Sequence, residues 1–118
     1  MVVGCTDAGS RTYVVSGTVT LDGQPLEDGD IYFYPLDPNV RADAGKIKHG
    51  RFAFRTTAGA KRVEIVASRL VPGKRTPMGG PVREQFLPPR YNTATTLTAD
   101  VSPTGDNHFP YALQSDPP

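Results

Sequence analysis

Glycine and proline punctuate the whole chain, and this limits what it can fold into. The 118 residues include twelve glycines and twelve prolines. Proline lacks the N–H group that a helix interior needs, and glycine lowers helix stability, so long helices are disfavoured. No apolar run approaches the roughly 18 residues of a membrane span. The pattern favours one domain of short strands joined by turns.

The runs between these breaks alternate in polarity with a period of two residues. From Tyr13 to Leu21 every second side chain is apolar or small, and the turn pair Asp22-Gly23 follows. Such alternation indicates half-buried strands. Further strands are expected at 30–36, 46–49, 51–55, 61–70, 95–101 and 109–113. We therefore predict an all-β fold, an antiparallel β-sandwich of about seven strands, with Pro110 on an edge strand.

The N-terminus predicts a site of lipid attachment. Val2, Val3, Gly4 and Cys5 are similar to the end of a bacterial lipoprotein signal, in which small residues precede a cysteine that receives lipid. A complete signal needs a positive start and an apolar run of about 7–15 residues, which would lie upstream. We predict a lipid-anchored envelope protein that faces the periplasm or the exterior. Without an upstream signal the protein would be cytoplasmic, and Cys5 an incidental thiol in a frayed tail.

These patterns divide the chain into three parts. Residues 1–11 form a signal remnant and flexible tether, since the residues after Cys5 are small and polar. Residues 12–114 form the β-sandwich domain, and residues 115–118 form a tail.

The middle of the chain carries most of the positive charge. The net charge is −5 over residues 1–45, +9 over residues 46–90 and −3 over residues 91–118. Such blocks indicate a basic face for an anionic partner, or charges that neutralise one another once the strands pair. Residues 71–90 also contain five prolines and three glycines, which predicts a long surface loop.

The cations of this predicted loop form the candidate partner-binding site. Arginine binds carboxylate and phosphate groups in bidentate geometry, so the expected partner is a protein or an anionic polymer. The alternative is a structural loop whose last residues brace it against the sandwich. The candidate residues are Arg69, Lys74, Arg75, Arg83, Arg90 and Tyr91, which are opposed only by Glu84.

No set of residues predicts a catalytic, metal or cofactor site. His49 and His108 are the only histidines, fewer than the ligands of a zinc site. Asp37, Asn39 and Asp43 offer oxygen atoms but lack the EF-hand pattern, and turn formation explains them better.

The serines indicate no catalytic site either, and the overall charge indicates no nucleic-acid partner. Ser16, Ser68 and Ser102 lie in no Gly-x-Ser-x-Gly elbow. The sequence pI is near 7.9 and no recognition helix is expected, so nucleic acid is not a predicted partner. We predict a protein that is not an enzyme and uses no cofactor.

The segment VSGTVTLDGQPLEDGDIYFYP resembles the opening of carboxypeptidase-regulatory-like domains, which are also called transthyretin-like or prealbumin-like. GKIKHGRFAF and KRVEIVASR are similar to the hairpin and the core strand that follow in that family. The resemblance spans 12–114 and implies a prealbumin-like sandwich, as in small bacterial envelope lipoproteins. The chain ends in QSDPP, unlike the Tyr-Arg-Gly-Ser end of the transthyretin-like hydrolase, so that activity is not implied. The shared residues are Gly17, Val19, Leu21, Asp22, Gly23, Pro25, Leu26 and Gly29.

The predicted function is therefore binding or structural support in a secreted cell-envelope protein, with the basic Pro/Gly-rich loop as its interaction surface. The alternative is a carbohydrate-binding accessory module. Sugar faces need exposed aromatic rings, and the chain has no tryptophan. The rings that could serve are those of Tyr32, Tyr34, Tyr91 and Tyr111.

Overall fold

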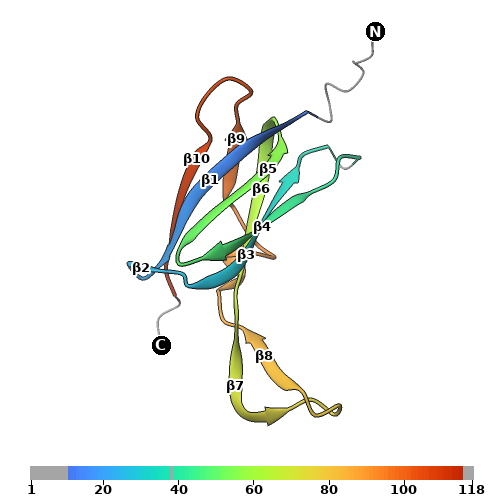
Figure 1. Cartoon of the computed structure of the whole chain (residues 1–118), viewed down its shortest axis with the longest axis vertical. Coiled ribbons are helices and arrows are strands. Elements are labelled where there is room, and N and C mark those ends of the chain that lie inside the picture. Colours follow the sequence, from blue (N-terminus) through green and yellow to red (C-terminus); the bar gives the residue numbers. More distant parts are fainter. Residues whose placement is uncertain (1–10, 38, 116–118) are drawn as a thin grey trace.

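The computed structural model describes residues 11–37 and 39–115, which form strands and one 3-10 turn (Figure 1). No α-helix occurs among these residues, so the all-β prediction is confirmed. No helix in the described part of the chain is long and apolar enough to cross a membrane. The elements are β1 (Thr12–Leu21), β2 (Gln24–Pro25), β3 (Asp28–Pro35), β4 (Asp43–Lys48), β5 (Arg51–Thr57), β6 (Gly59–Val66), β7 (Ser68–Arg75), β8 (Pro81–Gln85), η2 (Pro89–Tyr91), β9 (Thr98–Val101) and β10 (His108–Leu113).

Eight of the strands form one curled sheet. Its order is β10-β1-β5-β4-β3-β6-β9, and the short β2 pairs with β1. The pairing is antiparallel throughout except between β1 and β10, which run parallel. This pair corrects the prediction of a wholly antiparallel fold. After β9 a short loop carries the chain to the other edge of the curled sheet, where β10 pairs with β1 and not with β9.

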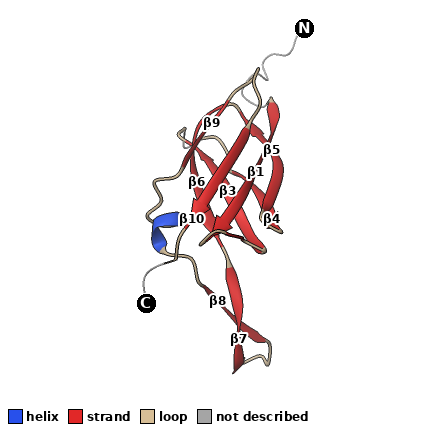
Figure 2. Cartoon of the chain, turned by 90° about the vertical axis from the view of Figure 1, so that its left-hand side faces the viewer, coloured by secondary structure: helices blue, strands red, loops and turns tan. Residues whose placement is uncertain are grey.

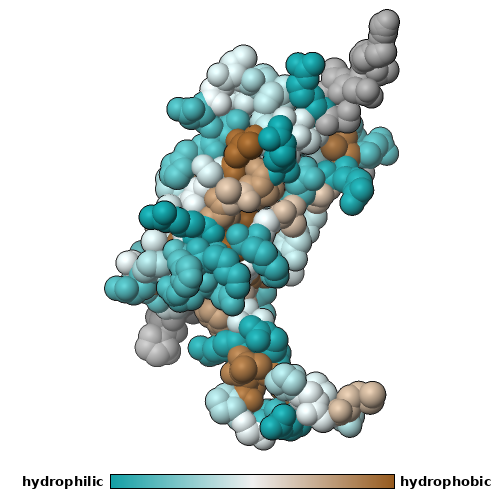
Figure 3. Space-filling model, viewed as in Figure 1, coloured by the Kyte–Doolittle hydropathy of each residue, from teal (hydrophilic) through white to brown (hydrophobic). Residues whose placement is uncertain are grey.

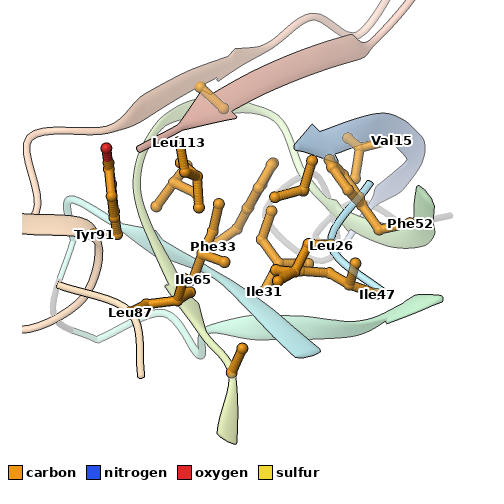
Figure 4. Packing of buried hydrophobic residues seen from close by; sticks show 14 of the residues in the cluster. Val15, Leu26, Ile31, Phe33, Ile47, Phe52, Ile65, Leu87, Tyr91 and Leu113 are labelled. Carbon is orange, nitrogen blue, oxygen red and sulfur yellow. The ribbon is translucent and has the colours of Figure 1, made fainter. Parts of the chain in front are cut away.

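The inner face of the curled sheet encloses the core. Val15 and Val19 of β1 are fully buried, as the period-two pattern predicted. Phe33 of β3 lies at the centre (Figure 4), where its ring meets those of Phe54 at 5.0 Å and Phe109 at 5.9 Å, both edge-on. Since Phe109 belongs to β10, the curl brings distant strands of the sheet face to face across the core.

Gly17 allows β1 and β10 to approach closely. A Cβ atom at this position would lie 2.0 Å from the carbonyl oxygen of Phe109 and 2.5 Å from the Cζ atom of Phe52. Both distances are far below van der Waals contact, so a side chain would force the strands apart. The glycine in the middle of this strand is therefore needed for packing.

The turn between β4 and β5 has the backbone that a two-residue hairpin favours. His49 has φ 51° and Gly50 has φ 74°. Positive φ at both central residues matches the twist of the strands. The prediction of two short strands around Gly50 is confirmed.

Residues 68–85 differ from the prediction. The sequence indicated a single strand over 61–70 and a loop over 71–90, but β6 ends at Val66, and β7 and β8 then form a separate antiparallel hairpin. The regular pairing is interrupted between Leu70 and Arg75, where Pro72 and Gly73 lie. The missing N–H of Pro72 therefore breaks no regular ladder. Figures 1 and 2 both show this hairpin projecting from one end of the curled sheet.

Candidate functional site

The β7–β8 hairpin, residues 68–85, carries four of the six predicted partner-binding residues. Its strands form a two-stranded sheet of their own and do not pair with the curled sheet. At the tip the N–H of Gly79 donates to the carbonyl of Thr76 at 2.8 Å, and the N–H of Thr76 donates to the carbonyl of Gly80 at 2.8 Å. The hairpin contributes to an elongated outline of 60 × 35 × 24 Å.

Two cations lie near the tip of the hairpin. The side chain of Lys74 is exposed and takes part in no hydrogen bond or ion pair with another described residue. Arg75 has one long hydrogen bond, from Nη1 to the carbonyl of Gly79 at 3.5 Å. Beside them, Met78 is 95% exposed, and Leu70 farther along the hairpin is 53% exposed. The tip thus combines available positive charge with apolar surface (Figure 3).

The two cations at the root of the hairpin are engaged locally. The Nε and Nη2 atoms of Arg83 donate to the hydroxyl of Ser68 at 3.0 Å and to its carbonyl at 3.1 Å. The guanidinium of Arg69 lies over the ring of Phe86, 5.3 Å from its centroid. These contacts hold the two strands together where they leave the sheet.

Arg90 and Tyr91 lie in η2, away from the hairpin tip, and they brace the end of the chain. The Nη2 atom of Arg90 donates to the carbonyl of Gln114 at 2.5 Å, and its guanidinium lies 4.9 Å from the centroid of the Tyr91 ring. The Tyr91 hydroxyl donates to the same carbonyl at 3.2 Å and accepts from the Gln114 N–H at 2.8 Å. Tyr91 is only 9% exposed, so the bracing alternative describes these two residues.

A pocket of about 280 Å³ lies where the hairpin meets the outer face of β3 and β4. Its side chains alternate in charge, with ion pairs from Lys46 to Asp30 at 2.9 Å and from Lys48 to Asp28 at 3.1 Å. The hydrogen bond and the negative charge of Asp30 raise the pKa of Lys46. These pairs were not predicted from the sequence, although the two-residue spacing within each strand was a signal for them. The lining residues are Asp28, Gly29, Asp30, Lys46, Lys48, Ser68 and Arg83.

A wider depression of about 590 Å³ adjoins this pocket on the outer face of β1 and β5. Lys46 and Lys48 line it together with Arg51 and His108. Arg51 forms no ion pair with any described residue, whereas both lysines are neutralised by aspartates. On the sheet, Lys46, Lys48 and Arg62 each pair with an acidic side chain, whereas Lys74 and Arg75 near the hairpin tip form no ion pair with any described residue.

The other groups considered in the sequence lie apart from one another. The Nδ1 atom of His49 lies 3.0 Å from Glu27 Oε1, and that of His108 lies 3.4 Å from the hydroxyl of Ser16. The N–H of Asn39 donates to Asp37 Oδ1 at 2.9 Å, which is the expected turn. The described residues hold no group of three histidine, cysteine or acidic side chains placed to share a metal ion. Cys5 lies outside the described residues.

The four tyrosines of the carbohydrate alternative separate into different environments. Tyr32 and Tyr34 stack on the outer face of β3, with ring centroids 6.2 Å apart and planes at 30°. Arg62 lies over the Tyr34 ring at 4.8 Å. Tyr91 is buried in its brace, and the Tyr111 hydroxyl donates to the carbonyl of Thr98 at 3.0 Å. Of these four tyrosines, Tyr32 and Tyr34 stack on each other, and Tyr111 stacks on Phe52.

Comparison with known proteins gives no family. No protein-family model matches the chain, and no curated protein matches it. Among solved structures, it is similar to a 9R-lipoxygenase from Cyanothece PCC8801, with 12% sequence identity and a TM-score of 0.45. The match covers 89% of this chain but only 16% of the lipoxygenase. A likeness this distant carries no conclusion about fold or activity.

Proposed function

We propose that the chain is a non-enzymatic binding module that contacts an acidic protein or an anionic polymer through the β7–β8 hairpin. The observation that carries the proposal is the contrast in charge pairing. Lys46 and Lys48 on the curled sheet are neutralised by aspartates, whereas Lys74 at the hairpin tip has no side-chain partner among the described residues and Arg75 has only one long hydrogen bond.

The shape of the hairpin suits this role. It extends beyond the sheet, so a partner could contact both of its sides without meeting the core (Figure 2). A guanidinium such as that of Arg75 can grip a carboxylate or phosphate with two parallel hydrogen bonds. An isolated two-stranded hairpin is marginally stable, so contact with a partner would also stabilise it.

The proposal also includes the type of β-fold, the lipid attachment and the location of the protein. We propose a prealbumin-like sandwich, supported by the opening motif and by the packing of Phe33 against Phe109 across the core. Lipid attachment at Cys5 and an envelope location are proposed from the sequence. β1 begins at the end of the sheet that lies opposite the hairpin (Figure 1). An anchor that precedes β1 would favour an orientation in which the hairpin points away from the membrane.

The test compares two variants that lose the same charge. Lys74→Gln combined with Arg75→Gln removes the tip cations, and Arg11→Gln combined with Arg41→Gln removes two exposed cations elsewhere. Binding to fluorescent polyglutamate and to polyphosphate is measured by anisotropy over a range of salt concentrations. The tip variant should bind about tenfold more weakly, a loss of roughly 1.4 kcal/mol. Equal weakening by both variants would show that only net charge matters.

The stacked, half-buried pair Tyr32 and Tyr34 favours the carbohydrate-binding alternative, because sugar rings pack on aromatic faces. A glycan array probed with the native chain and with Tyr34→Ala distinguishes the two functions. Binding that Tyr34→Ala abolishes and the tip variant leaves intact would support the carbohydrate module. An array without binding would remove it.

A further inference from the structure

Lys61 is a buried lysine that forms no ion pair with any described residue. It lies on β6 and is 2% exposed, which is rare for lysine unless the ammonium group is paired. Its Nζ atom donates to the hydroxyl of Thr57 at 2.5 Å, and none of the ion pairs among described residues includes it. A hydroxyl carries no negative charge, so the ammonium form lacks the compensation that burial demands.

Burial affects the protonation of this amine. Loss of solvation lowers the pKa of Lys61, and the more distant negative charge of Asp43 opposes this only in part. A lysine with a lowered pKa spends more time as the neutral amine, whose lone pair is a nucleophile. The chain has three other lysines, Lys46, Lys48 and Lys74, and all of them are exposed.

The buried lysine borders a small pocket. Lys61 and its partner Thr57 both line a depression of about 320 Å³ at the end of the sheet formed by β3 and β6. Most of its wall is apolar, and Asp37 is its only acidic residue among those described. The apolar and small residues of the wall are Pro35, Leu36, Val40, Ala58 and Ala60.

From this juxtaposition we propose that Lys61 is a reactive amine that captures a small apolar aldehyde as a reversible imine in this pocket. The nitrogen lone pair attacks the carbonyl carbon, and the π electrons of the C=O bond move to oxygen. The nitrogen loses a proton and the oxygen gains one, which gives a carbinolamine. A proton from solvent then reaches the hydroxyl oxygen, and water leaves as the C=N bond forms. The resulting iminium nitrogen returns a proton to solvent, so the net products are the imine and water. No oxidant or reductant is consumed, and added water reverses the reaction.

The other lysines provide an internal control for the test. The whole protein is incubated at neutral pH with benzaldehyde and cyanoborohydride, which reduces any imine to a stable benzylamine. Peptide mass spectrometry then measures the rate at each lysine. Lys61 should be labelled several-fold faster than Lys74, although Lys74 is far more exposed. Labelling of Lys61 at the same rate as Lys74, or more slowly, would overturn the proposal.

A matched pair of variants tests the pocket itself. Leu36 is 73% exposed and lines the pocket, so Leu36→Asp should fold and should place a carboxylate at its wall. It should slow labelling of Lys61 several-fold, because the carboxylate favours the ammonium form and makes the wall polar. Leu70→Asp makes the same change on the hairpin and should leave the rate at Lys61 unchanged. Equal rates in the two variants would contradict a role for the pocket.

Discussion

The curled sheet and the β7–β8 hairpin are both built from strands, but different forces hold them. In the sheet, alternate side chains pack into a closed core around Phe33, and the strands from β1 to β6 along the sheet path are paired on both edges. In the hairpin, each strand has one neighbour, and Leu70 and Met78 remain exposed. The hairpin strands therefore form without burying their apolar side chains, whereas the stability of the sheet comes from the side chains buried in its core. Changes in the hairpin should leave the sheet folded.

The largest expected effect comes from the centre of the core. Phe33→Ala removes a fully buried ring that meets those of Phe54 and Phe109, so it should lower the free energy of unfolding by about 3–5 kcal/mol. Met78→Ala at the hairpin tip should change it by less than about 0.5 kcal/mol. Urea denaturation followed by circular dichroism measures both. Similar losses in the two variants would end the distinction between the regions.

A glycine in the sheet and a glycine in the hairpin turn should respond differently to substitution by alanine. Gly17→Ala brings a methyl group against the Phe109 carbonyl and the Phe52 ring, and overpacking of this kind costs about 1–3 kcal/mol. At Gly80, in the hairpin turn, the nearest atom to an added Cβ is the Thr76 hydroxyl at 3.5 Å, an ordinary contact. Gly80→Ala should therefore shift the thermal midpoint little. A larger fall of the thermal midpoint in Gly80→Ala than in Gly17→Ala would mean that the hairpin turn limits the stability of the protein.

The root of the hairpin should show a smaller and local effect. Arg83→Ala removes two hydrogen bonds to Ser68, which are worth about 0.5–1.5 kcal/mol each. Amide hydrogen exchange should become faster in β7 and β8 and remain unchanged in β1 and β5. Arg75→Ala, which loses only a 3.5 Å contact, is the control and should leave both regions unchanged. Faster exchange in β1 would show that the two regions unfold together.

The last prediction concerns Tyr111. Its ionisation should change the free energy of unfolding only at alkaline pH and not at neutral pH. Burial raises the pKa of Tyr111 from 10.0 to about 12. Above pH 10 the unfolded chain releases this proton while the folded chain keeps it, so the free energy of unfolding falls as the pH rises toward 12. Tyr111→Phe should make this fall less steep. A pH series of urea midpoints measures it, and identical slopes for the two proteins would contradict the raised pKa.

Much of the sheet could be predicted because its pattern is local. The alternation at Val15 and Val19 identified both the strand and its buried face, and the turn at Gly50 was predicted from its residue type. The parallel pairing of β1 with β10 could not be predicted, since it joins segments about ninety residues apart. The hairpin was missed because proline and glycine usually indicate a loop, and here they lie where the pairing is irregular.

The candidate site was predicted in part for similar reasons. Basic residues of the 69–91 segment were identified, but η2 turns Arg90 and Tyr91 toward Gln114. The burial of Lys61 was missed, although its position in the strand carries a signal. It lies two and four residues before Val63 and Ile65, so in a strand it must share their buried face. The alternation that identifies a core face therefore also identifies a lysine that points into it.

The parallel pairing of β1 with β10 has a mechanical consequence. The pair is in register from Ser16 beside His108 to Leu21 beside Leu113, so the chain enters at one end of the pair and leaves at the other. A pull on the two ends of the chain would slide these strands past each other and strain their hydrogen bonds together, not one after another. The domain should therefore resist stretching when it is pulled by its two ends.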